Sequence, residues 1–168
     1  MHPETPVGGV AISEVFPEKA HGVGEYLQKF ATSFGITNMI MPEKMPNTRR
    51  AIAAAEFARD HEKLHDFRRA AMAAYWQEGK DLEDNAVIAA IAKTVGINPQ
   101  ETVAAMDAER YLSRVDFRRW EAMQAGVTGI PFFIIGSERI AGCHPYEKLV
   151  AIAEQNGAVR RDADKAGL

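Results

Sequence analysis

The stretch Gly126–Gly136 constrains the fold of this chain more than any other part of it. A glycine-flanked bend leads into Pro131, and Phe-Phe-Ile-Ile follows before the next glycine. A short apolar run rich in β-branched and aromatic residues predicts a strand that is buried on both faces. Pro131 would be the first residue of that strand, where its missing N–H costs no ladder hydrogen bond. The stretch therefore predicts a fixed bend that enters a buried strand.

The Ile130–Pro131 peptide bond is open to two interpretations from the local sequence. A trans proline would simply open an edge strand. A tight bend between Gly129 and Gly136 could instead hold a cis bond, because free X-Pro bonds favour trans by only about 0.5–1 kcal/mol. The residues themselves leave both alternatives open.

A hairpin and a helix are expected after this strand. Gly136–Glu138 is a short polar turn, and Arg139–Gly142 has the pattern of a second strand. Pro145 then opens a final helix, which has Leu149, Ile152 and Ala153 on one face.

This order of a Thr-Gly-Ile-Pro loop, two antiparallel strands, a glycine and a closing helix resembles the C-terminal half of the thioredoxin fold. The stretches Gly126–Gly136, Ile140–Gly142 and Pro145-Tyr146 are most similar to the DsbA-like family, in particular its FrnE-like branch. The 2-hydroxychromene-2-carboxylate isomerases and kappa-type glutathione transferases are more distant resemblances. The resemblance implies an α/β, helix-rich thioredoxin-like fold with a large helical insertion. It also implies that Pro131 is cis and that Thr128, Ile130 and Pro131 bind substrate.

The length of 168 residues predicts one domain with a substantial core. On the family's arrangement, residues 1–46 are a remnant and connector and residues 47–125 are the helical insertion. Residues 126–157 supply the hairpin and final helix, and residues 158–168 form a tail.

Charge and hydropathy exclude several classes of partner. The net charge is −3, and the scattered arginine pairs are offset by 23 acidic residues, so a nucleic-acid-binding surface is not expected. No apolar run approaches membrane-spanning length, and the first residues lack a signal-peptide pattern. We therefore expect a cytoplasmic protein with neither a membrane nor a nucleic-acid partner.

Helices are predicted wherever apolar residues recur at helical spacing between capping signals. Asn98, Pro99 and Glu101 form the clearest start signal, and Asn47 is a second cap. The expected helices cover Glu25–Phe34, Thr48–Arg59, Lys63–Glu78, Asn85–Val95, a segment from Pro99, and Tyr111–Met123.

The remaining N-terminal segments are expected to lack helix. Met1–Pro17 is rich in proline and glycine, with Val10–Ser13 as a short extended piece. The methionine-rich segment Ile36–Met45 is interpreted as a buried extended connector, with an adaptable wall of a substrate groove as the alternative.

His61–His65 matches the HExxH pattern, in which two histidines one helical turn apart bind zinc. That chemistry requires one continuous helix and a third ligand. Here the apolar face changes register between Ala58 and Leu64, which predicts a junction of two helices through the motif. We therefore expect no metal site.

Cys143 is the single cysteine, so neither an internal disulfide nor a Cys-x-x-Cys pair exists in this chain. Its position next to His144 and before a helix would favour a reactive thiolate. Free cysteine is more often a packed small residue, and this is the interpretation we favour.

The family resemblance begins just after the strand–helix–strand unit that carries the family's Cys-x-x-Cys. It implies a thiol–disulfide oxidoreductase whose reactive pair is not in this chain, acting on a protein or small-molecule thiol or disulfide. The alternatives are a non-catalytic binding protein and a glutathione-using isomerase, which alone would need glutathione as a cofactor. Because the hairpin would then lack neighbouring strands, a homo-oligomer is expected.

Overall fold

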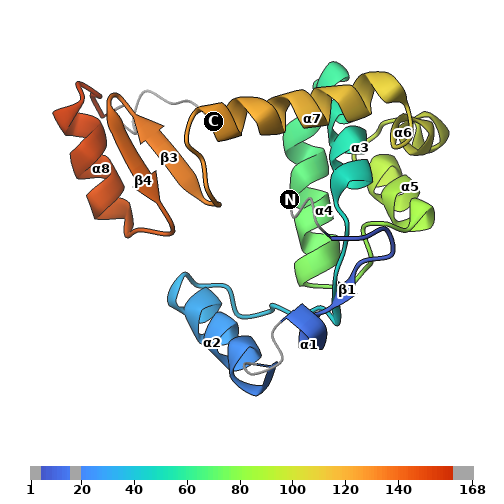
Figure 1. The fold of residues 1–168 in the computed structure, drawn as a ribbon, viewed down its shortest axis with the longest axis horizontal. Coiled ribbons are helices and arrows are strands. Elements are labelled where there is room, and N and C mark those ends of the chain that lie inside the picture. Colours follow the sequence, from blue (N-terminus) through green and yellow to red (C-terminus); the bar gives the residue numbers. More distant parts are fainter. Residues whose placement is uncertain (1–4, 16–19, 161–168) are drawn as a thin grey trace. The chain divides into compact units, whose positions relative to one another are not determined.

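The computed structural model describes residues 5–15 and 20–160, and the chain divides into two compact units, residues 1–118 and 119–168. Figure 1 shows the order of the elements along the chain. The first unit contains β1 (Val10–Ala11), α1 (Ile12–Val15), α2 (Ala20–Ser33), β2 (Lys44–Met45), α3 (Arg49–Asp60), α4 (Leu64–Trp76), α5 (Asn85–Thr94), α6 (Pro99–Ala105) and the first part of α7 (Glu109–Gln124). The second unit contains the end of α7, then β3 (Phe132–Ile135), β4 (Glu138–Ala141) and α8 (Tyr146–Gln155).

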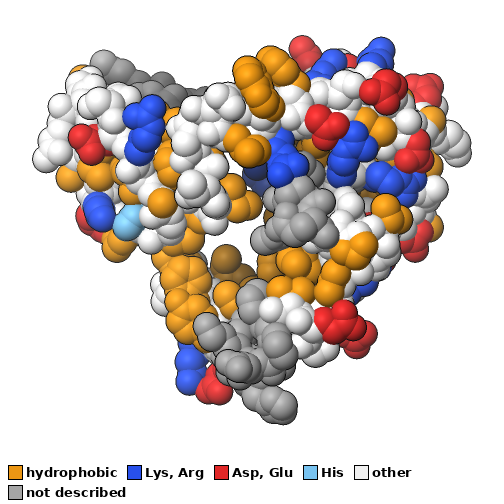
Figure 2. Space-filling view, in the orientation of Figure 1, with side chains coloured by type: hydrophobic (Ala, Val, Ile, Leu, Met, Phe, Trp, Pro, Cys, Tyr) orange, Lys and Arg blue, Asp and Glu red, His pale blue; other side chains and the backbone are white. Residues whose placement is uncertain are grey.

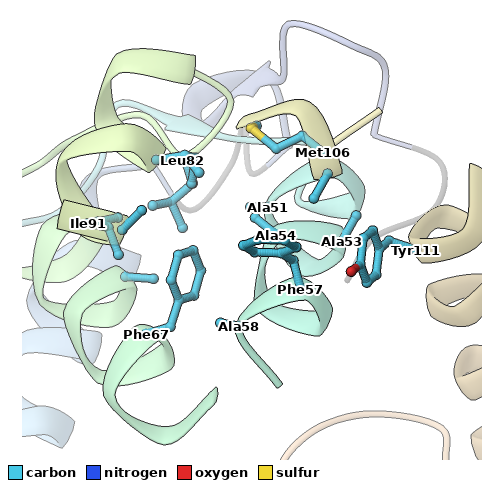
Figure 3. Close-up of a cluster of buried hydrophobic side chains, with 14 of the residues drawn as sticks. Ala51, Ala53, Ala54, Phe57, Ala58, Phe67, Leu82, Ile91, Met106 and Tyr111 are labelled. Carbon is cyan, nitrogen blue, oxygen red and sulfur yellow. The ribbon is translucent and has the colours of Figure 1, made fainter. Parts of the chain in front are cut away.

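The core of the first unit is built on the alanine-rich face of α3. Ala53, Ala54 and Ala58 are fully buried, so the neighbouring helices approach this face closely. Phe57 of α3 is buried as well, and larger buried side chains from other parts of the unit lie around this helix: Phe67, Ile88, Ile91, Met106 and Tyr111. Figure 3 shows Phe67 on one side of α3 and Tyr111 on the other. Burying side chains of this size stabilises a fold by about 1.5–3 kcal/mol each.

The predicted helix boundaries are confirmed where capping residues set them. The Asn98 side chain accepts hydrogen bonds from the N–H groups of Gln100 and Glu101, and Pro99 is the first residue of α6. The prediction that Asn47 is the cap of a helix from Thr48 is wrong by one residue: α3 begins at Arg49, and Thr48 is its cap residue without a side-chain capping bond. Asn47 Oδ1 still accepts from the Arg49 N–H, in the turn just before the helix. Boundaries that depend on local side-chain chemistry are thus visible in the sequence.

Two expectations about the N-terminal part are wrong. Ile12–Val15, placed partly in an extended piece, forms the single-turn helix α1. The Ile12 N–H donates to the Glu43 carbonyl at 2.9 Å, so the main chain of the first helical residue is still bonded to the segment before β2. The helix α2 begins at Ala20, five residues earlier than expected, because a glycine inside a helix costs only about 1 kcal/mol. Residues 1–4 and 16–19, which the prediction of a non-helical Met1–Pro17 also covers, lie outside the described residues.

The connector between α2 and β2 is also more exposed than expected. Ile36 is 49% exposed and Ile40 is 47% exposed, so the prediction of a buried segment fails there. The helix before it carries Tyr26, Phe30 and Phe34 at a spacing of four residues, with their rings in contact along the helix surface. All three are exposed, and Figure 2 shows hydrophobic side chains over α2. The three rings thus contact one another and remain exposed.

The second unit has the hairpin and final helix that the sequence predicts. β3 pairs with β4 in antiparallel register, with Phe133 opposite Ile140 and Ile135 opposite Glu138. The expectation that β3 is buried on both faces is wrong, since Ile134 is 51% exposed and the other three residues are partly exposed. The physical reason is that the hairpin is a two-stranded sheet, with no third strand among residues 5–15 and 20–160 to cover it.

Candidate functional site

The loop from Gly126 to Pro131 is the candidate site, and its two ends are fixed by hydrogen bonds. The Val127 N–H donates to the Ala122 carbonyl at 2.9 Å, so the loop leaves α7 in a defined direction. At the other end, the Gly142 N–H donates to the Pro131 carbonyl at 2.9 Å. The Ile130–Pro131 peptide bond is cis. The loop therefore has a defined path on the surface of the second unit.

The predicted binding residues all lie on this loop and face solvent. Thr128 and Pro131 are exposed, and Ile130 is 84% exposed, one of the most exposed large apolar side chains in the described residues. An isolated exposed isoleucine is common on protein surfaces. Here it is presented by a loop that is held at both ends, which makes it a suitable contact for the apolar part of a ligand.

Cys143 follows Gly142, whose N–H is bonded to the Pro131 carbonyl, so Cys143 lies near the loop in space although it is twelve residues away along the chain. The prediction that this cysteine is a packed small residue is wrong: the thiol is free and exposed. The neighbouring His144 uses its ring nitrogens elsewhere, with Nε2 at 3.1 Å from the Ala141 carbonyl and Nδ1 at 3.3 Å from Lys148 Nζ. The structure thus places Cys143 near the loop, with its imidazole neighbour engaged by other groups.

The HExxH motif is divided by the end of α3, as its sequence register predicts. The helix ends at Asp60, Glu62 has a φ of 60°, and α4 begins at Leu64. His61 Nδ1 lies 2.9 Å from the Phe57 carbonyl, and the ring packs on Phe57. The described residues contain no group of three or more potential metal ligands. The two histidines therefore lack the single-helix geometry of a zinc site.

A pocket elsewhere in the first unit was not singled out by any sequence motif. A pocket of about 330 Å³ lies between the connector residues 40–46 and the end of α4, and Met41 and Tyr75 contribute to its lining. Lys44 and Asp81 also line it, with Lys44 Nζ 2.6 Å from Asp81 Oδ2, and this hydrogen bond raises the pKa of the lysine. Burial raises the pKa of Tyr75, whose hydroxyl donates to the Lys44 carbonyl. The methionine-rich segment thus lines a pocket, and the alternative that it is the wall of a substrate groove stays a prediction.

A network of charges joins the end of α3 to α7. Glu56 is buried and accepts two hydrogen bonds of 3.0 Å from Arg59. One turn later, Asp60 accepts from Arg114 at 2.7 Å and from Arg110 at 3.0 Å. The hydrogen bond from Arg114 holds the pKa of Asp60 below its usual value. Each carboxylate is matched by arginines, so the network is explained by its role in joining two helices.

Comparison with known proteins places the fold. The model of the DSBA-like thioredoxin domain matches residues 1–153. The chain belongs to the DsbA-like thioredoxin-domain family. Its fold is accordingly the helix-rich DsbA-like thioredoxin fold.

Individual relatives agree with this assignment. The uncharacterised protein YwbO of Bacillus subtilis (strain 168) is 25% identical over 143 residues, which cover 80% of this chain and 70% of YwbO. The structure of a 2-hydroxychromene-2-carboxylate isomerase superposes with a TM-score of 0.71 at 19% identity, covering 86% of this chain and 69% of the isomerase. A proposed protein disulfide isomerase from Nitrosomonas europaea gives 0.66 at 17% identity, covering 83% of this chain and 74% of that protein. At these identities the two structures share the fold with this chain.

No helix among residues 5–15 and 20–160 is both long enough and apolar enough to cross a membrane.

Proposed function

We propose that this DsbA-like chain binds a thiol or disulfide substrate through the loop of Thr128, Gly129, Ile130 and Pro131, and serves thiol–disulfide exchange as its substrate-binding part. The observation that supports this proposal most is the presentation of Ile130, which is 84% exposed on a loop held by hydrogen bonds at both ends. Such a loop needs little reordering when a ligand binds, and less conformational entropy is lost.

Thiol–disulfide exchange on a substrate disulfide requires two further thiols, one that attacks the disulfide and one that resolves the mixed disulfide. A thiolate attacks a substrate disulfide, one mixed disulfide forms, and one substrate sulfur leaves as a thiolate. A second thiol must then attack the mixed disulfide to release the product. Cys143 is the single cysteine of this sequence, so these residues cannot supply both thiols. The proposed role of the chain is therefore to bind and orient the substrate while other thiols exchange.

The free thiol also bears on the compartment. An exposed, unpaired cysteine such as Cys143 persists in a reducing environment, and on that ground we propose that the protein is cytoplasmic.

A short peptide with one S-methylthiolated cysteine between apolar neighbours is a suitable probe, used with a Cys143→Ser background so that no covalent adduct forms. Binding is measured by the anisotropy of a labelled peptide. Ile130→Asp is expected to weaken binding at least tenfold, because a charge at the contact must be desolvated. Val7→Asp is the matched control, since Val7 is also 84% exposed but lies in the other compact unit.

Equal weakening by the two substitutions, or no effect of either, would overturn the proposal. Reduced glutathione forms a second arm of the experiment. Binding of glutathione that depends on Ile130, without binding of the disulfide peptide, would favour the glutathione-using isomerase instead.

A further inference from the structure

The pocket beside Tyr75 lies under a short arch of the chain, residues 40–44, that is bonded to the end of α4. The Ile40 N–H donates to the Trp76 carbonyl at 2.6 Å, and the Tyr75 hydroxyl donates to the Lys44 carbonyl at 3.1 Å. Two consecutive residues of α4 thus hold the two ends of the arch. All of these residues belong to the first unit. The wall of the pocket is therefore in place before any ligand binds.

The apolar lining of the pocket combines one aromatic ring with adaptable side chains. It consists of Ile40, Met41, Pro42, Pro46 and Tyr75. The Tyr75 ring is held edge to face against the Trp76 ring, with centroids 4.9 Å apart. The volume of about 330 Å³ is at the lower end of the range for ligand pockets. Methionine conforms to differently shaped partners, so the pocket is suited to a small apolar group such as a single ring.

Both lysines at the pocket already have carboxylate partners. Lys44 Nζ lies 2.6 Å from Asp81, and Lys80 Nζ lies 2.5 Å from Glu78. An ammonium group that is paired in this way is neutralised locally and attracts a second anion only weakly. The two lysines therefore do not make this pocket a site for an anionic ligand.

Glu43 is the carboxylate that these pairs leave over. It lines the pocket and is exposed, and within residues 5–15 and 20–160 no cation forms an ion pair with it. Glu83 lies 4.0 Å from Lys44 Nζ, so the charged groups at the pocket are four carboxylates and two ammonium groups. A negative surface attracts cations and repels anions. The described residues contain no group of three or more potential metal ligands, so a bare metal ion does not fit this charge.

We propose that this pocket binds a small organic cation, a primary amine attached to an aromatic or other apolar group. The ammonium group would pair with Glu43, and the apolar part would contact Met41 and the Tyr75 ring. An aromatic ring next to a carboxylate is a favourable environment for an ammonium group, because both attract positive charge. The proposal concerns the first unit alone and does not rest on substrate binding at Ile130.

Three ligands of similar shape test the proposal: 2-phenylethylamine, 2-phenylethanol and phenylacetate. The two tryptophans are Trp76 and Trp120, so Trp120→Phe leaves Trp76, beside the pocket, as the single fluorescent reporter. At low salt the amine should bind at least twofold more tightly than the alcohol, and phenylacetate should bind least. Glu43→Gln should weaken amine binding about two- to fivefold, the effect of losing one exposed ion pair. Glu62→Gln, which removes an exposed carboxylate between α3 and α4, is the matched control.

Charge reversal and chemical shifts supply two further readouts. Glu43→Lys should reverse the preference, so that phenylacetate binds more tightly than the amine. Amide shifts caused by the amine should concentrate at residues 40–46 and 75–81, and Ile130→Asp should leave them unchanged. The proposal would be overturned by the absence of saturable amine binding, by equal effects of Glu43→Gln and Glu62→Gln, by an unreversed preference in Glu43→Lys, or by shifts that concentrate elsewhere.

Discussion

At the scale of single residues, Gly136 shows how the hairpin turn restricts its sequence. It has a φ of +59°, and a Cβ at this position would overlap the side chain of Asn156 after the end of α8. Gly136→Ala should therefore destabilise the protein through both backbone strain and steric conflict, by about 1–3 kcal/mol in total. Urea unfolding measures this loss of free energy.

Gly126→Ala is the matched control for this prediction. Gly126 has a φ of +78° with no neighbouring atom within 4 Å of an added Cβ, so its substitution reports the backbone strain alone. The double substitution Gly136→Ala with Asn156→Ala should restore the part of the unfolding free energy that the steric conflict removes. If Gly136→Ala and Gly126→Ala lower the unfolding free energy equally, the steric conflict with Asn156 does not contribute to the destabilisation.

Asp60 gives a prediction for the dependence of stability on pH. Its pKa is lowered in the folded state, chiefly by the hydrogen bond from Arg114. A lowered carboxyl pKa contributes stability above the unfolded-state value of about 3.9, and this contribution is lost as the pH falls through the folded-state value. Asp60→Asn should thus cost about 1 kcal/mol at neutral pH, and its difference from the unmodified protein should shrink between about pH 4 and pH 2. Urea midpoints across that range test it.

The control for this titration is Asp66→Asn. Asp66 is 54% exposed and lies 3.6 Å from Lys63, a surface pair that contributes little. A difference between Asp60→Asn and the unmodified protein that stays constant with pH would contradict the assignment.

At the scale of elements, the side chain of Asn98 caps α6 and stabilises its first turn. Two N–H groups of the first turn donate to Asn98 Oδ1, at 2.9 and 3.1 Å. Asn98→Ala should destabilise the protein by about 1 kcal/mol, while Asn98→Asp, which keeps an acceptor at the cap, should be close to neutral. Thermal unfolding of the two variants checks this, and equal effects would remove the cap as the cause.

The elements that the sequence predicted share one property: their signals are local. The Asn98-Pro99 start of α6 and the hairpin about Gly136 both depend on a few neighbouring residues. The burial of β3 and of the connector was predicted wrongly, because it depends on what covers these segments. The exposure of Cys143 depends on the same kind of long-range information.

At the scale of the whole molecule, one cysteine limits what these 168 residues can catalyse. Reduction of insulin by dithiothreitol should proceed at the uncatalysed rate in the presence of this chain, since attack and resolution need separate thiols. Cys143→Ser should give the same rate. Catalysis that persists in Cys143→Ser would contradict the assigned chemistry, because no thiol would remain.

The family and much of the candidate site were also accessible from the sequence, since Thr128, Ile130 and Pro131 lie within one recognisable stretch. The pocket beside Tyr75 was not, because it brings residues 40–46 next to the end of α4 without a shared motif. Sites formed by segments far apart in the chain require the fold itself.

The most direct test of the account is an amide chemical-shift map of the Cys143→Ser protein during titration with the S-methylthiolated peptide. If substrate binds at the loop, the shifts should concentrate at Val127–Phe132 and at Ala141–His144, the two segments joined by the bond between Gly142 and Pro131. In the same titration of Ile130→Asp, those shifts should appear only at a peptide concentration at least ten times higher. Shifts that concentrate around the Tyr75 pocket, or are absent from the loop at saturation, would contradict substrate binding at this site.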